Sequence, residues 1–397
     1  MRNSRQTLAH LVSTVPPESN YRKILLVTND LGPRSGGIET FIHGLLEKLD
    51  GNQIVIYTSS QTGDTEFDLE LNRRHGVIVY RDRSKVLIPT PRVVREVKKI
   101  MRKHNSTTIW FGAAAPLALM APNLRRAGAK RIVALTHGHE VWWAKLPIFN
   151  LAMRRIGNSC DVLTYLGPFT KSAISKAVGK KVKLVQISPG ISVEHFQPGA
   201  KPAELLTKYK ISDRPTLLCV GRLVHRKGQD QLIEAMTLIK NKVPGALLLI
   251  IGSGPREAHL RKLISKYNLG NDVRLLGRIS YDQLPRHFLL GDVFVSPSRS
   301  RLAGLEVEGL GIVYLEASAC GLPVIAGDSG GAPDAVQVNR TGLVVDGTDE
   351  KEIAQACISL LSNPKLSKEF GANGRIWAVE NWNWNYWGER FAEVLEG

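Results

Sequence analysis

The chain has 397 residues, of which 43% are apolar and 22% charged, a composition typical of a soluble globular protein with two domains. Its apolar runs fall short of the roughly 18 residues that a transmembrane helix needs, so we expect no membrane span. The first twenty residues lack the apolar core of a signal peptide, and the four cysteines form no CxxC pair. We therefore expect neither secretion, nor a zinc site, nor a disulfide scaffold, and the cysteine usage suits a reducing cytoplasm.

The net charge of +17 is distributed unevenly along the chain. Residues 1–200 carry 29 Lys and Arg against 14 Asp and Glu, whereas residues 201–397 carry 24 against 22. A basic half indicates an anionic partner, which could be nucleic acid, an acidic membrane surface or a phosphate-bearing substrate. Charge alone does not choose among these three.

Short apolar runs rich in β-branched residues alternate with helical patterns along the whole chain. They cover residues 23–29, 54–58, 77–80, 108–111, 131–136, 161–166 and 183–187, and then 216–221, 246–252, 273–277, 292–298, 323–327 and 342–346. Strands that are buried on both faces have this composition, and their alternation with helices predicts parallel sheets. The fold class is therefore α/β, with two doubly wound, Rossmann-like domains that face each other across a cleft, where ligands bind.

A polar, proline-containing stretch near residues 197–215 separates the two series of strands. We expect an extension over residues 1–20, a first domain over 21–195, a second domain over 196–375, and a C-terminal helix over 376–397. The tryptophan-rich segment WAVENWNWNYW begins this last part, and it predicts that the helix docks back on the first domain.

Residues 306–318, EVEGLGIVYLEAS, place two carboxylates eight positions apart, Glu308 and Glu316. The glycines favour a loop before a helix that begins near Ile312. The N–H groups of Gly311, Ile312 and Val313 at a helix start can bind phosphate. Glu316 could then accept hydrogen bonds from a ribose and Glu308 from a sugar. The alternative is a surface helix with solvated glutamates and an apolar core face.

Two further strand-to-helix turns carry features of a phosphate site. In GRLVHRKG, Arg222 and Lys227 could neutralise a diphosphate, although both could be ordinary surface cations, and Arg226 could simply be solvated. In LGPRSGGIET, Gly36 and Gly37 would allow a phosphate or a sugar to approach the backbone.

Two histidines, His137 and His139, follow the predicted strand at 131–136. No third ligand is nearby in the sequence, so a metal pair is not favoured. One of them could instead donate or accept a hydrogen bond to substrate, or both could be structural.

The segment 81–104 is strongly basic and predicts an amphipathic helix. Thr90 can cap it with Pro91 at its first position, and the apolar stripe indicates ordinary packing with a solvated opposite side. The basic positions outside that stripe are Arg92, Arg95, Lys98, Lys99, Arg102 and Lys103. Each basic residue near an anionic bilayer is worth about 1 kcal/mol, so this face could hold the protein on a membrane. The loop from Lys85 to Pro89 could dip into the interface.

Taken together, these residues resemble the retaining nucleotide-sugar glycosyltransferases of family 4, which have the two-domain GT-B fold. Glu308 and Glu316 match the Glu-x7-Glu motif of that family, Arg222 and Lys227 its phosphate pair, and Gly36–Gly37 its glycine turn. The segments THGHEVWW, GRLVHRKGQD and VEGLGIVYLEASACGLPVIAG resemble the actinobacterial phosphatidylinositol monomannoside mannosyltransferases in particular. The resemblance covers nearly all of the chain after about residue 20, whereas GGIET departs from the pattern, in which glutamine is commoner after the isoleucine.

The resemblance implies transfer of α-mannose from GDP-mannose to a phosphatidylinositol monomannoside, with retention at the anomeric carbon and no aspartate nucleophile. The leaving diphosphate would accept the proton of the acceptor. Arg222, Lys227 and the helix start would stabilise its charge, and Glu308 and Glu316 would hold mannose and ribose. His137, or else His139, would contact the mannose. Arg278 and Ile279 are assigned to the guanine pocket, and no DxD motif calls for a protein-bound metal, so Mg²⁺ would accompany the nucleotide if it takes part.

The resemblance also assigns the basic first domain to an anionic glycolipid acceptor at an anionic membrane, with His139, Lys85, Arg92, Arg95, Lys98 and Lys99 on that side. It places the protein in the cytoplasm, peripherally bound to the inner face of the plasma membrane. A relative that uses a UDP-sugar or a soluble acceptor remains the alternative, and a catalytically inactive carrier is a third. Nucleic-acid binding is not favoured, because no nucleic-acid-binding motif occurs and the phosphate-site residues lie in the neutral half.

Overall fold

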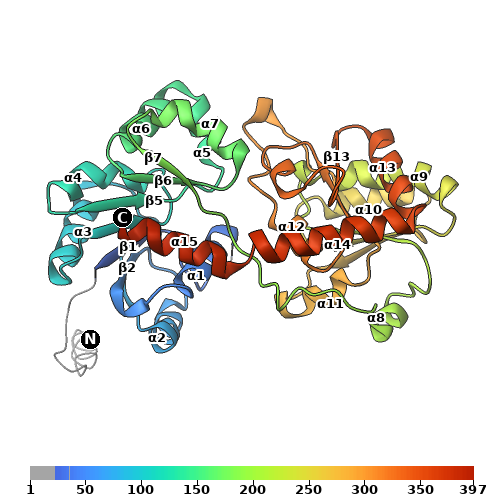
Figure 1. The fold of residues 1–397 in the computed structure, drawn as a ribbon, viewed down its shortest axis with the longest axis horizontal. Helices are drawn as coiled ribbons and strands as arrows, with labels where there is room; N and C mark the ends of the chain where they lie inside the picture. Colours follow the sequence, from blue (N-terminus) through green and yellow to red (C-terminus); the bar gives the residue numbers. More distant parts are fainter. Residues whose placement is uncertain (1–22, 35) are drawn as a thin grey trace, which may run out of the picture.

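Two separate parallel sheets organise the protein, for which the computed structural model describes residues 23–34 and 36–397 (Figure 1). The first sheet has the order β3-β2-β1-β4-β5-β6-β7 and the second the order β10-β9-β8-β11-β12-β13. Both orders start in the middle and proceed outward in two directions, so each unit is doubly wound. The fold class predicted from the sequence is thus confirmed. The extension expected over residues 1–20 lies outside the described residues.

Each of the thirteen predicted runs contains or overlaps one of the strands. The strands are β1 (Ile24–Thr28), β2 (Ile54–Thr58), β3 (Ile78–Arg81), β4 (Thr108–Phe111), β5 (Arg131–Ala134), β6 (Val162–Tyr165), β7 (Lys183–Gln186), β8 (Thr216–Val220), β9 (Leu247–Ile251), β10 (Val273–Gly277), β11 (Val293–Ser296), β12 (Val324–Gly327) and β13 (Gly342–Val345). The central strands are buried along their whole length, because helices cover both faces of each sheet.

Helices fill the connections between successive strands and extend beyond the last one. In the first unit they are α1 (Gly37–Leu46), α2 (Asp64–His75), α3 (Pro91–Lys103), α4 (Ala121–Arg125), α5 (Glu140–Lys145), α6 (Pro147–Gly157) and α7 (Pro168–Val178). In the linker and second unit they are α8 (Ala203–Lys208), α9 (Gln229–Lys242), α10 (Glu257–Lys266), α11 (Leu284–Phe288), α12 (Ile312–Ala319), α13 (Glu350–Leu361) and α14 (Pro364–Asn381), followed by α15 (Trp384–Glu396). No helix in the described part of the chain has both the length and the hydropathy needed to cross a bilayer.

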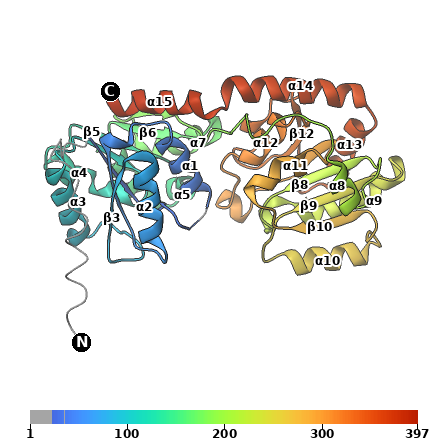
Figure 2. The same ribbon diagram turned by 90° about the horizontal axis from the view of Figure 1, so that it is seen from below.

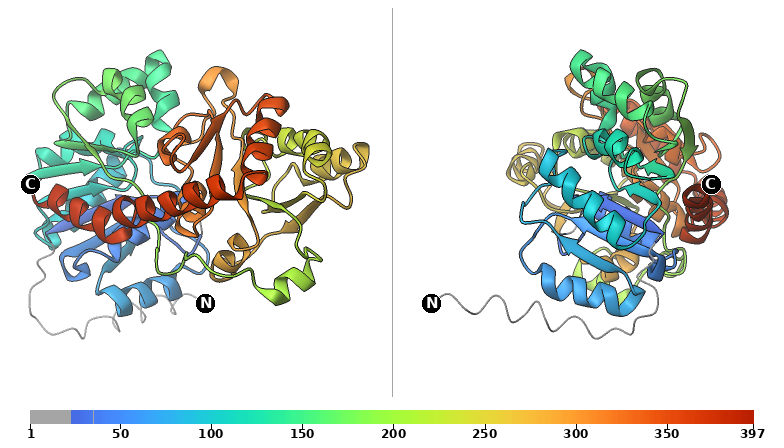
Figure 3. Two further views of the ribbon diagram at one scale, coloured as in Figure 1. Left: turned by 45° about the vertical axis from the view of Figure 1, so that its right-hand side comes forward. Right: turned by 90° about the vertical axis from the view of Figure 1, so that its left-hand side faces the viewer.

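The helices of the first unit form two layers on opposite faces of its sheet (Figure 3). Helices α3, α4, α6 and α7 contribute buried side chains to the apolar cluster on one face. Helices α1, α2 and α15 cover the other face, where the apolar cluster continues into the second unit. This division decides which helices share an outer surface.

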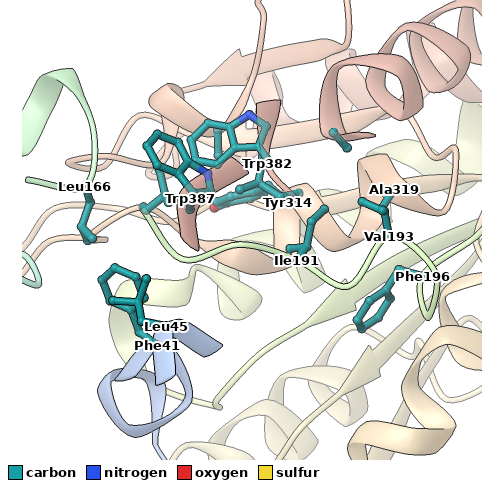
Figure 4. Packing of buried hydrophobic residues seen from close by; sticks show 14 of the residues in the cluster. Phe41, Leu45, Leu166, Ile191, Val193, Phe196, Tyr314, Ala319, Trp382 and Trp387 are labelled. Carbon is teal, nitrogen blue, oxygen red and sulfur yellow. The ribbon is translucent and has the colours of Figure 1, made fainter. Parts of the chain in front are cut away.

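The chain passes between the two units twice, and the two passages lie side by side (Figure 4). The backbone N–H of Ile191 donates to the carbonyl of Trp382 at 2.7 Å. The guanidinium of Arg375 donates to the carbonyls of Val193 and Phe196 at 3.0 and 2.8 Å, and also to a carbonyl at the end of α12. These bonds fix the linker against the last helices.

The C-terminal part differs from the expected single helix over 376–397. Residues 364–381 form one helix, α14, which packs on α12 and α13 of the second unit, so the predicted boundary falls inside a helix. The break comes at Trp382 and Asn383, where the Asn383 side chain accepts a hydrogen bond from the N–H of Tyr386 and caps α15. Figure 2 shows α14 and α15 end to end along both units.

Helix α15 docks on the first unit, as the sequence predicted. The ring of Phe391 contacts that of Trp110 on β4 with 4.9 Å between ring centroids, and both side chains are fully buried. The Nε of Arg131 on β5 donates to the carbonyl of Val394 at 2.7 Å. The last helix is therefore part of the first unit's core, although it follows the second unit in the chain.

The docked helix generates a stability prediction. We expect Phe391→Ala to destabilise the first unit by about 3 to 5 kcal/mol, because the substitution leaves a cavity against Trp110. Tyr386→Ala, on the exposed side of the same helix, should change stability by less than about 1 kcal/mol. Calorimetric unfolding measures both, and equal effects would show that α15 is not part of this core.

Candidate active site

The carboxyl ends of the two sheets meet at a contact between two glycines. Gly138, after β5, and Gly309, before α12, approach so closely that a Cβ built on Gly138 would lie 3.1 Å from the Cα of Gly309. A Cβ on Gly309 would likewise lie 3.1 Å from the carbonyl oxygen of His137. His137 and Glu308, 171 positions apart in the sequence, are therefore brought to one place.

Two polar contacts hold this junction on either side. A carboxylate oxygen of Asp334, in the second unit, accepts a hydrogen bond at 2.9 Å from the N–H of Phe169 in the first turn of α7. The ammonium of Lys145, at the end of α5, donates to the carbonyl of Gly304 at 2.9 Å. Both units thus supply the frame around the candidate site.

The carboxylate of Glu308 is buried and ion-paired with two cations. The Lys227 ammonium lies 2.7 Å from it, and the Arg226 guanidinium also pairs with it. Burial acts to raise the pKa of Glu308, but Lys227 and Arg226 outweigh burial and lower it. Glu308 is therefore ionised and fixes Lys227. Arg226, for which the sequence left a solvated position open, is instead ion-paired, because the turn His225–Lys227 directs both cations at the same carboxylate.

The two cations predicted to bind a diphosphate, Arg222 and Lys227, differ in exposure to solvent. Lys227 is buried in the turn, and Gly228 after it has φ +69° and no room for a Cβ, which would lie 1.9 Å from the carbonyl oxygen of Pro297. Arg222 is exposed, and among the described residues no carboxylate lies within ion-pair distance of it. Its charge is therefore available to a ligand.

Helix α12 begins at Ile312, as the sequence predicted. Gly311 precedes it with φ +80°, and a Cβ there would lie 2.4 Å from the ring of Tyr314. The first N–H groups of a helix have no acceptor within the helix. Those of Ile312 and Val313 therefore point away from the helix body, close to Glu308, as an anion site at a helix start requires.

Glu316 differs from Glu308 in having no partner. Its side chain is only 6% exposed, and within the described part of the chain no donor is hydrogen-bonded to its carboxylate. Burial alone raises its pKa to about 7. A buried carboxylate without a protein donor can be satisfied by hydroxyl groups of a ligand.

His137 is held in one protonation state. Its Nε2 lies 2.5 Å from the carbonyl of Gly112, so this nitrogen carries a hydrogen and donates it. Burial lowers the pKa of His137, so the ring is neutral at pH 7. Its Nδ1 is then an acceptor, which suits a sugar hydroxyl better than a developing positive charge.

His139 lies beside His137, and the two rings stack with 6.3 Å between their centroids. Gly138 between them has φ +95°, so the chain turns at this point. The Nε2 of His139 lies 3.3 Å from Glu140, whose other oxygen accepts the N–H of His137 at 2.9 Å. The fully buried Glu140 was not predicted, because its role depends on this turn. No group of three or more His, Cys, Asp or Glu is arranged to hold a metal ion within residues 23–34 and 36–397.

The glycine turn before α1 lies beside carboxylates. A Cβ on Gly36 would lie 2.4 Å from Glu39, whereas one on Gly37 would meet no atom within 4 Å. Glu39 pairs with Arg34 at 2.7 Å, and burial together with Glu39 raises the pKa of Asp30. Of the two ligands that the sequence left open here, this charge favours a sugar hydroxyl over a phosphate.

Arg278 and Ile279 follow β10, which is separated from β8 by one strand. Arg278 is exposed and Ile279 half-buried. With strands about 4.8 Å apart, they lie about 10 Å along the sheet edge from the Arg222 turn, a spacing compatible with a base and a diphosphate. Their assignment to guanine stays a prediction.

Helix α3 has the predicted boundaries, cap and apolar stripe. The hydroxyl of Thr90 accepts from the N–H of Val93, and the stripe Val93, Val94, Val97, Ile100 and Met101 is buried. Of the predicted basic face, Arg95 and Lys99 are exposed and Lys98 is half-buried. The charge of Arg92 is paired, because its guanidinium makes two bonds of 2.7 and 2.9 Å to Asp82 and lowers the pKa of this carboxyl.

The loop before α3 exposes apolar side chains. Val86 and Ile88 are exposed, and Lys85 lies beside them. Leu87 between them is buried, and its N–H and carbonyl bond to the side-chain amide of Asn29 at 2.6 and 3.0 Å. The loop is thus anchored at one residue and presents its two neighbours outward.

Solved structures with the same fold are glycosyltransferases. Alr3699/HepE from Anabaena, in complex with UDP, superposes with a TM-score of 0.78 at 18% identity, covering 94% of this chain and 99% of that one. Sucrose-phosphate synthase from Thermosynechococcus elongatus gives 0.75 at 22% identity, over 94% and 98%. The two sheets of this chain thus have the GT-B fold of these solved structures.

Sequence comparison identifies the family. Residues 35–195 match the family described as Glycosyltransferase Family 4, and residues 204–377 match Glycosyl transferases group 1. The GDP-mannose-dependent alpha-(1-6)-phosphatidylinositol monomannoside mannosyltransferase of Mycolicibacterium smegmatis is 44% identical over 94% of this chain and 98% of its own length. Its monoacylated-substrate counterpart from Corynebacterium glutamicum is 40% identical over the same shares. The chain belongs to glycosyltransferase family 4, in the branch that holds these mannosyltransferases.

The unpaired Glu316 predicts a pH-dependent cost in stability. Its folded pKa of about 7 exceeds its ordinary value of 4.5, so the stability it contributes is complete below 4.5 and is lost as the pH rises through about 7. Glu316→Gln should therefore resemble the parent at about pH 5 and exceed its stability by up to about 3 kcal/mol at about pH 8. Urea unfolding at both pH values measures this, and a pH-independent difference would contradict it.

The contact between glycines predicts a catalytic effect without a large change in stability. Gly309→Ala places a methyl group 3.1 Å from the backbone of His137, so the two units must separate by a few tenths of an ångström. We expect kcat/KM for sugar transfer to fall about tenfold to a hundredfold. Gly270→Ala, where a Cβ meets nothing within 4 Å, is the control and should keep full activity.

Proposed function

We propose that this protein is a retaining mannosyltransferase that transfers α-mannose from GDP-mannose to a phosphatidylinositol monomannoside, giving the dimannoside, at the cytoplasmic face of the plasma membrane. The observation that carries the proposal is the arrangement of Glu308, Lys227 and Glu316 around the start of α12. The names of the relatives with 40 to 44% identity over 94% of the chain support the choice of donor and acceptor.

In this proposal the diphosphate of the donor binds between Arg222, Lys227 and the start of α12. One of the three donors of the Lys227 ammonium bonds to Glu308 at 2.7 Å, which leaves two for phosphate oxygens. Because these charges are already fixed, they stabilise the departing diphosphate without reorganisation. Any Mg²⁺ that enters with the nucleotide would lie on the phosphates, and we assign it no protein ligand.

The two carboxylates then hold the two sugars of the donor. Glu316 accepts the ribose hydroxyls, which supply the donors that the protein does not. Glu308 orients the mannose through the lone pairs that Arg226 and Lys227 leave open, and Nδ1 of His137 accepts a further mannose hydroxyl. Arg278 and Ile279 contact the guanine.

Transfer proceeds on one face of the sugar. The acceptor hydroxyl oxygen bonds to the anomeric carbon as the bond from that carbon to the diphosphate oxygen breaks. The proton of the hydroxyl passes to this leaving oxygen, so the configuration is retained without a protein nucleophile. The residues of the site act by holding the donor and stabilising its charge.

The first unit takes the acceptor from the membrane in this proposal. Arg95 and Lys99 of α3 attract anionic lipid, and Val86 and Ile88 enter the interface. A pocket of about 530 Å³ between β3 and α3 lies beside them. Its lining includes the cations Arg83, Lys99 and Lys103 and the rings of Tyr57 and Tyr80, and it suits anionic head groups.

The alternative is transfer from a UDP-sugar or to a soluble acceptor. The D-inositol 3-phosphate glycosyltransferase of Pseudarthrobacter chlorophenolicus, whose name gives a soluble acceptor, is 35% identical over 50% of this chain. The exposed Val86 and Ile88 have no use in such an enzyme, which favours the lipid acceptor.

Nucleotide binding tests the donor. We expect GDP and GDP-mannose to raise the melting temperature, with about 3 kcal/mol of stabilisation at a hundred times Kd, and UDP and ADP to have little effect. Arg222→Ala and Glu316→Ala should lose most of this shift. Lys262→Ala, an exposed cation on α10, is the matched control and should keep it.

Radiolabelled mannose transfer to phosphatidylinositol monomannoside tests the acceptor. A thermal response to UDP alone would replace the donor but keep the site. No response to any nucleotide would overturn the proposal.

A further inference from the structure

Almost all of the net charge of the protein lies in one quarter of the chain. Residues 85–183 contain 19 Lys and Arg but only three Asp and Glu, a net charge of +16 out of the total of +17. This stretch contains α3, α4, α6 and α7, which together cover one face of the first sheet. The fold therefore gathers a charge that is dispersed over about a hundred residues onto one layer.

The three acids of this stretch do not offset that charge at the surface. Glu140 is fully buried, Asp161 pairs with Arg125 at 2.6 Å, and Glu96 is half-buried. The described helices of the layer thus present no exposed carboxylate. Such a face attracts a polyanionic surface and repels a second copy of itself.

Helix α6 adds exposed apolar side chains to this basic layer. Ile148 and Leu151 are 80% and 71% exposed, although the same helix buries Met153 and Ile156 on its inner side. The helix is therefore apolar on two sides. Arg154 and Arg155 follow directly and are exposed. Exposed apolar residues next to arginines are typical of a helix that lies in a membrane interface.

A loop of the second unit reaches the same place. Lys145, one residue before the exposed Leu146, donates to the carbonyls of Ala303 and Gly304 at 3.3 and 2.9 Å. Leu302 on this loop is 65% exposed, and Leu302 and Ala303 have φ +51° and +52°, a conformation that costs energy in residues other than glycine. The loop is thus held in a strained form that exposes an apolar side chain.

Helix α6 and the loop 85–89 lie at the same edge of the first unit. Helices α5 and α6 follow the carboxyl end of β5, and the loop follows that of β3, and parallel strands end at one edge. Four strand spacings separate β3 from β5, which is about 19 Å. In Figure 1, α5, α6 and α7 form the upper edge of the first unit.

We propose that Leu146, Ile148, Leu151, Leu302 and Leu305 form a second membrane contact, the α6 surface, which rests on an anionic bilayer and includes a segment of the donor-binding unit. This inference rests on the proposed function and deepens it, because it gives the enzyme a second membrane contact in addition to the loop 85–89. The positive charge of the layer favours an anionic bilayer over a second copy of the chain as the partner of this surface, since a second copy would bring two basic faces together.

A groove beside the α6 surface fits the same partner. It has a volume of about 700 Å³ and lies between α4 and α6, lined by Leu119, Pro122, Leu151, Arg154 and Arg155 among others. Its apolar floor and two guanidinium groups match the upper acyl chain and phosphate of an anionic lipid.

Site-specific labelling tests the contact directly. All four native cysteines are buried, and burial raises the pKa of Cys160 and Cys219 to about 12, so a thiol reagent will select a new surface cysteine. We would attach an environment-sensitive dye to Ile148→Cys and, as a control, to Leu69→Cys. Leu69 is 58% exposed on α2 in the opposite layer. Vesicles of phosphatidylcholine with phosphatidylinositol should shift the emission to the blue at position 148 only.

Vesicle affinity gives the second measurement. Ile148→Ser with Leu151→Ser should weaken binding to these vesicles about tenfold, and Leu69→Ser with Ile376→Ser should leave it unchanged. Stabilisation by GDP should be the same in both, which shows that the fold is intact. Soluble inositol phosphate should not shift the dye, since it lacks acyl chains.

Three other outcomes would overturn the inference. Unchanged affinity and no dye shift would show that α6 does not touch the bilayer. A shift that depends on protein concentration without vesicles would identify an interface between copies, and a shift with RNA alone would identify a nucleic-acid surface. Loss of all GDP stabilisation with an intact dye shift would instead refute the proposed donor and leave the membrane contact standing.

Discussion

The structure of the candidate site depends on one buried ion-pair cluster, in which Glu308 holds Lys227 and Arg226. Removing three charged groups from water is unfavourable, and such a cluster persists only when the geometry satisfies its members. Here a single carboxylate bonds to two cations, so the cluster keeps a net positive charge and several free donors. An anion that binds beside the cluster would neutralise this remaining positive charge and accept hydrogen bonds from the free donors. Glu308 is followed directly by Gly309, which contacts the first unit. The ion-pair cluster and the contact between the two units are therefore joined through adjacent residues.

The two glutamates of the motif show how environment divides their roles. Both side chains are almost fully buried, at 7% and 6% exposure, yet their pKa values move in opposite directions. Lys227 and Arg226 keep Glu308 ionised, whereas Glu316 has only burial acting on it. A partner-free carboxylate in the core makes no favourable contribution to folding at neutral pH. In the proposed function a ligand donates hydrogen bonds to this carboxylate, and in that physical sense the site would be incomplete without nucleotide.

Local sequence patterns predicted the helices and strands, whereas the ion-pair partners of the site residues depend on contacts that these patterns do not show. The strands, the start of α12 at Ile312 and the cap of α3 at Thr90 were predictable, because hydrophobic period, glycine and capping residues act within a few positions. The pairing of Arg226 with Glu308 was not, because it joins residues 82 positions apart. The pairing of Arg92 with Asp82 was not predicted either, since nothing in the local sequence shows that Asp82 turns toward it.

The distribution of charge separates two tasks that the enzyme must combine. The first unit carries nearly all the net charge in one layer, so a bilayer would hold this unit and fix its orientation. The second unit is almost neutral and contains the residues that we propose to bind the nucleotide, so in the proposed function the surface potential of the first unit would not compete for the donor phosphates. The linker between the two units is tied to the last helices by Arg375. A loop of the second unit that also reaches the membrane face, through its contact with Lys145, would couple lipid contact to the approach of Glu308 to His137. In such an arrangement the membrane takes part in assembling the site as well as supplying its acceptor.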